Sequence, residues 1–179
     1  MGRWPWLEWI RIGGLCVIVG SGCSVIDSSV GPRLSTDTTW AVLPFVNLTE
    51  TPQAGRRLEA ISSSLLLALG VKSSIRFSST QKEDLLGNDS VSDSQSAALA
   101  WAKSQQARYA LTGTVDEWRY KVGVDGEPAV GVTLEIVDVV TGAVVWSAVG
   151  AQTGWGREAV SAVAQKLVRQ LLEQVHLHS

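Results

Sequence analysis

The stretch ARYALTGTVDEWRYKVGVDGEPAVGVTLEIVDVVTGAVVWSAVGAQTGWGRE, residues 107–158, decides the fold of this chain. It contains three runs in which apolar and polar residues alternate, and this period of two is typical of strands that bury one face of a sheet. The first run continues to Tyr120 only if its register shifts once, which predicts a bulge. Thr141 and Gly142 lie between the second and third runs, where a glycine with positive φ favours a tight hairpin. The stretch therefore predicts an antiparallel meander.

The segments on either side of this meander are predicted to form a strand–helix–strand unit and the helices that cover the sheet. Residues 40–46, WAVLPFV, form the continuous apolar run of a buried strand, and Pro44, which cannot donate a hydrogen bond, predicts a bulge or an edge there. Residues 73–77 form a second, short strand. Apolar residues at helical spacing predict three helices, at residues 58–69, 93–106 and 160–175. The predicted fold class is α/β, with a mixed sheet of about five strands covered by helices.

Composition limits both the size of the fold and the class of partner. The chain has 179 residues, of which 45% are hydrophobic, and this is enough for one domain with a substantial core. Charged residues make up 18% and the net charge is −2, whereas a generic nucleic-acid-binding domain is basic. We therefore expect no nucleic acid among the partners.

Residues 1–22 have the pattern of an export signal rather than of a folded element. Arg3 and Arg11 give a weakly positive start, residues 10–19 are mostly apolar, and small residues follow. The apolar run is shorter than the roughly 20 residues that a membrane-spanning helix needs. We expect residues 1–22 to be a lipoprotein signal peptide that is cleaved.

The junction at Cys23 resembles the lipobox of bacterial lipoproteins, in which a small residue precedes the cysteine that receives lipid. Ser21 and Gly22 fit this pattern, whereas Gly20 stands where a leucine-like residue is usual. Cys23 is the only cysteine left after cleavage, so it cannot form an internal disulfide, and an acyl chain such as palmitate would give it a role. The competing interpretation is an ordinary secretory signal with a chance cysteine.

Residues 23–39 are predicted to be a lipidated tether, and residues 40–179 a single α/β domain. The tether contains Ser, Gly and Pro but shows no periodicity. At no more than about 3.5 Å per residue it spans less than about 60 Å, which would keep the domain close to its membrane. By analogy with bacterial lipoproteins, Ser24 favours sorting to the outer membrane.

Three motifs resemble a family of periplasm-facing lipoproteins: WAVLPFVN at 40–47, ARYALTGTV at 107–115 and DVVTGAVVW at 138–146. That family includes the curli secretion lipoprotein, a penicillin-binding-protein activator and the amino-terminal domain of the Tol-system propeller protein. These motifs are shared widely, so they indicate the fold more than the function. Residues 117–131 and 153–158 narrow the resemblance to the PelC-type lipoproteins of the Pel exopolysaccharide system. The resemblance covers residues 40–175, and its main departure, Gly20, concerns lipidation rather than the domain.

The resemblance implies a non-enzymatic ring of identical subunits on the periplasmic face of the outer membrane. Such a ring would sit beneath its partner, the Pel outer-membrane porin with a tetratricopeptide scaffold, and would serve export of the biofilm matrix. In that family the inner surface of the ring is electronegative and Pel is cationic, so charge would guide the polymer toward the porin. The matching loop of this chain carries Asp125 and Glu127, the expected funnel residues, and Asp116 and Glu117 are further candidates. The alternative is that the loop is only a solvated turn.

Trp155 is the candidate membrane contact. Gly154 and Gly156 remove the side chains on both sides of it, which is expected to leave the indole exposed. Tryptophan prefers the membrane interface, and in the resembled family the matching Trp is thought to face the outer membrane. The competing interpretation is a ring folded back onto the core. The other tryptophans at strand positions are expected to be structural: Trp40, Trp118 and Trp146.

No catalytic motif supports an enzyme, and no cofactor or metal site is predicted. His176 and His178 lie at the very end of the chain, and the sequence has no HExxH, GxSxG, P-loop or CxxC pattern. Neighbouring carboxylates are too common on turns to indicate acid–base catalysis. Two other non-enzymatic functions remain as alternatives. An adaptor that binds and activates a cell-wall synthase would be expected to have a longer tether, and a curli-like pore would need a spare pair of amphipathic strands.

Overall fold

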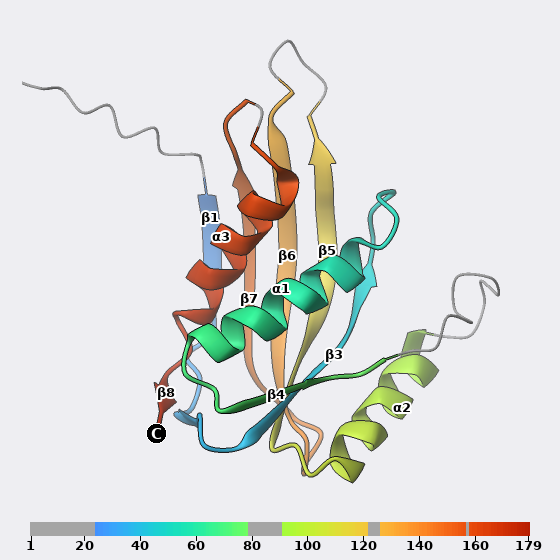
Figure 1. Ribbon diagram of the computed structural model, residues 1–179, viewed down its shortest axis with the longest axis vertical. Helices are drawn as coiled ribbons and strands as arrows, with labels where there is room; N and C mark the ends of the chain where they lie inside the picture. The colour runs from blue at the N-terminus through green and yellow to red at the C-terminus, as the bar shows by residue number, and fades with distance from the viewer. Residues whose placement is uncertain (1–23, 79–90, 122–125, 157) are drawn as a thin grey trace, which may run out of the picture.

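The computed structural model describes residues 24–78, 91–121, 126–156 and 158–179 (Figure 1). In these residues six strands form one mixed sheet in the order β1-β7-β6-β5-β3-β4. The strands are β1 (Ser24–Ser28), β3 (Thr39–Asn47), β4 (Ser73–Arg76), β5 (Tyr109–Tyr120), β6 (Pro128–Asp138) and β7 (Val144–Thr153). Neighbours from β5 to β1 are antiparallel, whereas β3 is parallel to both β4 and β5. The predicted α/β fold with a mixed sheet is confirmed, with six strands instead of about five.

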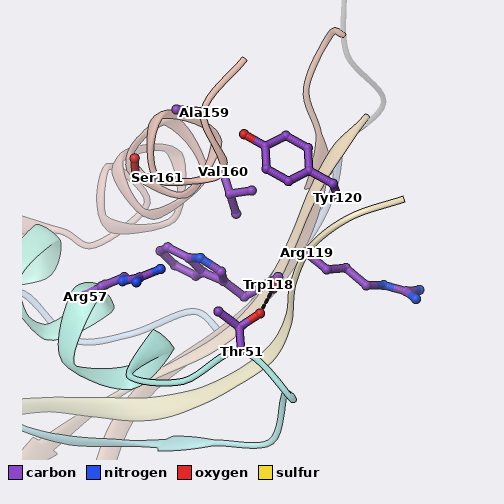
Figure 2. A pocket seen from close by; sticks show the side chains of 8 residues that line it. All are labelled: Thr51, Arg57, Trp118, Arg119, Tyr120, Ala159, Val160 and Ser161. Carbon is purple, nitrogen blue, oxygen red and sulfur yellow. Dashed lines mark hydrogen bonds between the residues drawn. The ribbon is translucent and has the colours of Figure 1, made fainter. Parts of the chain in front are cut away.

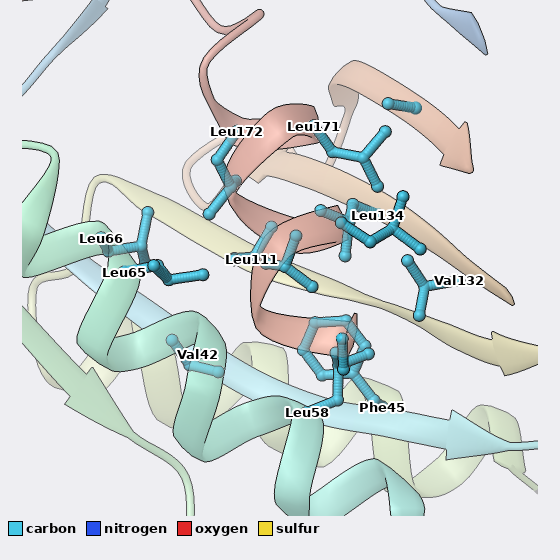
Figure 3. Packing of buried hydrophobic residues seen from close by; sticks show 14 of the residues in the cluster. Val42, Phe45, Leu58, Leu65, Leu66, Leu111, Val132, Leu134, Leu171 and Leu172 are labelled. Carbon is cyan, nitrogen blue, oxygen red and sulfur yellow. The ribbon is translucent and has the colours of Figure 1, made fainter. Parts of the chain in front are cut away.

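Helices α1 and α3 cover one face of this sheet, and α2 lies on the other. Within the described residues the helices are α1 (Ala54–Ala68), α2 (Val91–Ser104) and α3 (Val160–Leu172). Figure 3 shows Leu58 of α1 and Leu171 of α3 in the main core, together with Leu111 and Leu134 of the sheet. Strand residues that alternate with these, such as Ala110, form a second, smaller core with α2. Helix α2 therefore covers the opposite face, near the β6–β7 turn (Figure 1).

Both predicted irregularities of the strands are present. The pairing of β3 with β5 shifts between Val42 and Phe45, around Pro44, whose carbonyl accepts a hydrogen bond from the Thr112 hydroxyl at 2.9 Å. The pairing of β5 with β6 shifts between Val115 and Glu117. This second bulge decides which face of the sheet the following residues occupy.

The described part of the predicted tether is packed onto the domain, which corrects the expectation of a segment without structure. Strand β1 pairs with β7 along its whole length, and the half-buried Ile26 packs against the main core. Further on, β2 (Leu34–Ser35) pairs with β8 (Leu177–His178) at the end of the chain, and Leu34 is buried. Main-chain pairing at a free sheet edge needs no periodic side-chain pattern, so the sequence gives little sign of it. Cys23 lies outside the described residues, and its lipidation stays a prediction.

Candidate functional site

Three segments that are far apart in the sequence lie at one end of the sheet. These are the β5–β6 hairpin, the connection from β7 to α3 and the start of β1 (Figure 1). Ser24 lies opposite Gln152, and Trp155 follows three residues later along the chain. Glu127 immediately precedes β6 and is exposed, and its carbonyl accepts a hydrogen bond from the Lys121 amide at 2.7 Å. Asp125 lies outside the described residues.

Trp155 projects from this end with 64% of its surface exposed. The two flanking glycines are needed for reasons that differ from the predicted one. A Cβ on the buried Gly154 would lie 2.5 Å from Val163 and 2.9 Å from Pro128, so a close approach between α3 and β6 requires this glycine. Gly156 has a φ of +44°, which favours glycine. The backbone is therefore packed closely before the indole and turns after it, and the indole itself stays exposed.

Glu158 forms hydrogen bonds that link the β7–α3 connection to the rest of the domain. Its carboxylate accepts a hydrogen bond from Lys166 on α3, and its carbonyl accepts one from the Tyr120 hydroxyl at 3.0 Å. The Lys166 hydrogen bond, with its charge, holds the pKa of the Glu158 carboxyl below its ordinary value, against the opposing effect of burial. The segment that carries Trp155 is thus linked to both α3 and the end of β5.

Asp116 and Glu117 lie elsewhere, on the face of the sheet opposite α1 and α3. A Cβ on Gly131 of β6 would be 3.3 Å from the Glu117 Cβ and 3.7 Å from the Asp116 Cβ, so the bulge places both carboxylates on that one face. Glu127 precedes β6, whereas Gly131 is several residues into it, a separation of roughly 13 Å along the strand. The three predicted funnel residues that the structure describes, Asp116, Glu117 and Glu127, therefore do not form one cluster.

Hydroxyls and an arginine orient the two carboxylates on this face. The hydroxyls of Thr114 and Thr133 donate to Asp116 at 2.7 and 3.2 Å. Arg119 forms an ion pair with Glu117 at 2.8 Å. A shallow groove of about 270 Å³ runs beside them, and it is lined by Val25, Asp27, Asp116, Glu117, Gly131, Val149, Gly150 and Ala151. Asp27 is not among the predicted site residues, because residue 27 belongs to the predicted tether.

A second groove, of about 500 Å³, opens on the helical side at the same end of the sheet (Figure 2). Trp118 is nearly buried beneath it, and Tyr120 and Val160 form its walls. Figure 2 shows Arg57 reaching from α1 toward the Trp118 ring, while Arg119 points away. The Thr51 hydroxyl donates to the Trp118 carbonyl at 2.5 Å. Trp118 is structural, as predicted, and so are Trp40 and Trp146, which are also buried.

Two further properties of the described residues bear on function. They contain no group of three or more His, Cys, Asp or Glu side chains that could hold a metal ion. None of their helices has the length and apolar character needed to cross a membrane.

The chain resembles one protein-family model and several solved structures, while no curated protein matches it in sequence. The family model, described as the peptidoglycan-synthase activator LpoB, matches residues 49–151. The PelC dodecamer from Paraburkholderia phytofirmans is 41% identical with a TM-score of 0.73, and the match covers 87% of this chain and 100% of that chain. A single-substitution variant of that dodecamer matches with the same identity and coverage and a TM-score of 0.74.

A more distant likeness supports the fold alone. The lipoprotein GNA1162 from Neisseria meningitidis has a TM-score of 0.54 at 17% identity, over 76% of this chain and 96% of that chain. The family model and the PelC structures carry more weight, because the model spans more than half of the chain and the identity extends over the whole solved PelC chain. The chain therefore belongs to the family of PelC- and LpoB-type lipoproteins.

Proposed function

We propose that this protein forms a ring of identical subunits on the periplasmic face of the outer membrane and guides a cationic exopolysaccharide, Pel, toward its porin. The observation that carries the proposal is the 41% identity to a PelC protein that forms a dodecamer. The role is non-enzymatic, because the ring only orients a polymer that passes through it. Its partner in export of the biofilm matrix is the outer-membrane Pel porin with a tetratricopeptide scaffold.

The arrangement at one end of the sheet supports a membrane-facing orientation. Cys23 is bonded to Ser24, which pairs with Gln152 near the exposed Trp155. An acyl chain on Cys23 and the Trp155 indole would therefore meet the membrane from the same end of the domain. Each contact is weak alone, but a ring repeats both in every subunit, and the contacts act together.

The acidic loop between β5 and β6 is the proposed lining of the funnel. Glu127 is exposed and forms no ion pair with any residue that the structure describes, so its charge is available to a passing cation. Asp125 is two residues away in the same loop. Repetition of this loop around a ring would concentrate negative potential near the membrane, where a cationic polymer must enter the porin.

A second candidate function is an adaptor that binds and activates a cell-wall synthase. The specific observation in its favour is the description of the matching family model as a peptidoglycan-synthase activator. An adaptor must reach the synthase across the periplasm, and pairing of β1 with β7 shortens the free chain available for this. The docked strand therefore favours the export function.

The mass of the protein from residue 24 onward, measured by light scattering, tests the proposal. We expect a large closed oligomer for both the native chain and the Asp125→Ala/Glu127→Ala variant. Only the native chain should retain a chitosan oligomer, used as the cationic probe. A monomer at every concentration, together with capture of a cell-wall synthase from membranes, would favour the adaptor instead.

A further inference from the structure

A large part of the sheet has no helix over one of its faces in the described residues. Helix α2 covers this face over β3 and over the parts of β5 and β6 next to the β6–β7 turn, which leaves β1, β7 and the remaining parts of β5 and β6 open. Val25 is 68% exposed and Val149 is 47% exposed on this surface. Apolar residues with this exposure, side by side on adjacent strands, favour contact with another protein surface.

The open face carries mostly negative charge. Its acidic side chains on the described strands are Asp27, Asp116, Glu117 and Glu135. Arg119 pairs with Glu117, but Asp116 has only the hydroxyls of Thr114 and Thr133 as partners in the described chain. Asp116 is therefore held in a fixed position with its negative charge not neutralised.

The opposite side of the domain, formed by α1 and α3, carries the exposed Arg57 and the half-buried Arg169. Arg57 and Arg169 form no ion pair with other described residues. Between the two helices runs a groove of about 450 Å³ lined by small side chains, such as Ala60 and Ser64, and by Arg169. The two sides of the domain thus have complementary charge, and the helical side has a depression.

A closed ring of twelve imposes a geometric condition on these two sides. Each subunit uses two different surfaces, and successive subunits turn by only one twelfth of a circle. The two surfaces therefore lie on almost opposite sides of the subunit, as the open sheet face and the helical face do. If the ring axis runs along the strands, a residue has the same position along this axis in every subunit. Residues that meet across the contact must therefore lie at the same level along the strands.

Arg57 lies at the same level along the strands as Asp116 and Glu117. Glu117 and Trp118 are successive residues of β5, and they point to opposite faces of the sheet. Arg57 lines the groove above Trp118 on the helical side (Figure 2). Asp116 and Arg57 consequently lie at nearly the same level along the strands, on opposite sides of the domain.

We infer that the open sheet face of one subunit packs on the α1–α3 face of the next, with Asp116 of one copy facing Arg57 of its neighbour. This inference rests on the proposed ring and adds the surfaces that close it. It assigns Asp116 and Glu117 to the contact between subunits and leaves the funnel to the loop of Asp125 and Glu127. Opposite charges would select this register, and the apolar residues around them would exclude water.

Charge reversal tests this contact in the full chain, expressed with its leader and extracted in mild detergent. The variants are Asp116→Arg, Arg57→Glu and the double exchange, with Arg33→Glu in the exposed β1–β2 loop as the matched control. Mass photometry over a dilution series gives the concentration at which half of the chain is assembled. Circular dichroism of each variant establishes that it is folded.

Each single reversal should raise that concentration by about tenfold or more, because like charges then face each other in every contact. The double exchange should restore assembly, and Arg33→Glu should leave it unchanged. If folded Arg57→Glu assembles like the native chain, the inference is wrong while the ring stands, and pairing of β1 with β4 of the next copy becomes the better contact. If the native chain itself is monomeric at all concentrations, the proposed ring fails instead.

Discussion

Replacement of Asp138 should weaken the domain more than any other change at an acidic residue of the described sheet. Asp138 ends β6 and has only 11% of its side chain exposed. One carboxylate oxygen accepts hydrogen bonds from Arg108 at 2.7 Å and from the amides of Val140 and Thr141 at 2.9 and 3.1 Å. This single side chain therefore fixes the β6–β7 turn and attaches it to the start of β5.

The magnitude follows from these three hydrogen bonds. Each bond to a charged acceptor contributes roughly 1.5–3 kcal/mol when fully shielded from water. Arg108 is 40% exposed, and the turn amides gain water when Asp138 is removed, so the contributions must be reduced. We expect Asp138→Ala to lower the free energy of unfolding by about 2–3 kcal/mol. Asp138→Asn, which keeps an oxygen acceptor for the amides, should lower it by about 1 kcal/mol.

The same contacts predict a pH dependence. The hydrogen bond from Arg108, and then those from the two amides, hold the pKa of Asp138 below its ordinary value despite burial. A carboxyl with a lowered folded pKa stabilises the protein above its unfolded pKa of about 4, and this contribution is lost as the pH falls through the folded value. The difference between native protein and Asp138→Asn should therefore be full at pH 7 and shrink below pH 4.

Urea unfolding followed by circular dichroism, at pH 7 and in steps down to pH 2.5, measures this difference. Glu50→Gln, at an exposed carboxylate outside the helices and strands, is the matched control and should be nearly neutral throughout. A constant difference between native protein and Asp138→Asn across this pH range would refute the electrostatic explanation. An Asp138→Ala variant within about 0.5 kcal/mol of the native protein would refute the whole account of the turn.

Three further predictions concern the sheet and its membrane end. Gly113→Ala should cost about 3 kcal/mol or more in urea unfolding, because its Cβ would lie 1.9 Å from the Thr133 carbonyl oxygen. Trp155→Ala should change the unfolding free energy by less than about 0.5 kcal/mol, since the ring is exposed, yet reduce flotation with lipid vesicles severalfold. Ile26→Asp should release β1 from the sheet, seen as faster proteolysis within residues 24–36 while the rest of the domain stays resistant.

The strands of the meander could be predicted because their side chains alternate between a buried and an open face. The bulges could be predicted as well, at Pro44 from its missing donor and before Trp118 from the broken alternation. Strand β1 could not, because it is held at the sheet edge mainly by main-chain hydrogen bonds, and Ile26 is its one residue packed against the main core. The local sequence of such a segment predicts a loop, because the free edge of β7 with which it pairs is formed only in the folded sheet.

The sequence suggests candidate site residues, but it does not predict how they are arranged. Asp116, Glu117 and Glu127 are near one another in sequence, which suggested one acidic surface. Asp116 lies on the open sheet face because it alternates with the core residue Val115, and the bulge brings Glu117 onto the same face, whereas Glu127 stays at the end of the hairpin. A shift of one residue in the register decides which face of the sheet Glu117 occupies. The broken alternation in a sequence indicates that a bulge exists, but it does not show which side chains the bulge redirects.

Strand β1 also bears on the choice between the two proposed functions. A free lipidated tether would let the domain leave the membrane by up to about 60 Å, whereas pairing with β7 holds Ser24 opposite Gln152. Trp155 is three residues beyond Gln152, so no more than about 10 Å of chain separates it from the residue that pairs with Ser24. Such a short link suits a ring pressed against the membrane beneath a porin. An adaptor would need to release β1 before it could reach a distant synthase. A covalent crosslink between β1 and β7 should therefore block an adaptor, whereas it should leave polymer export through a ring intact.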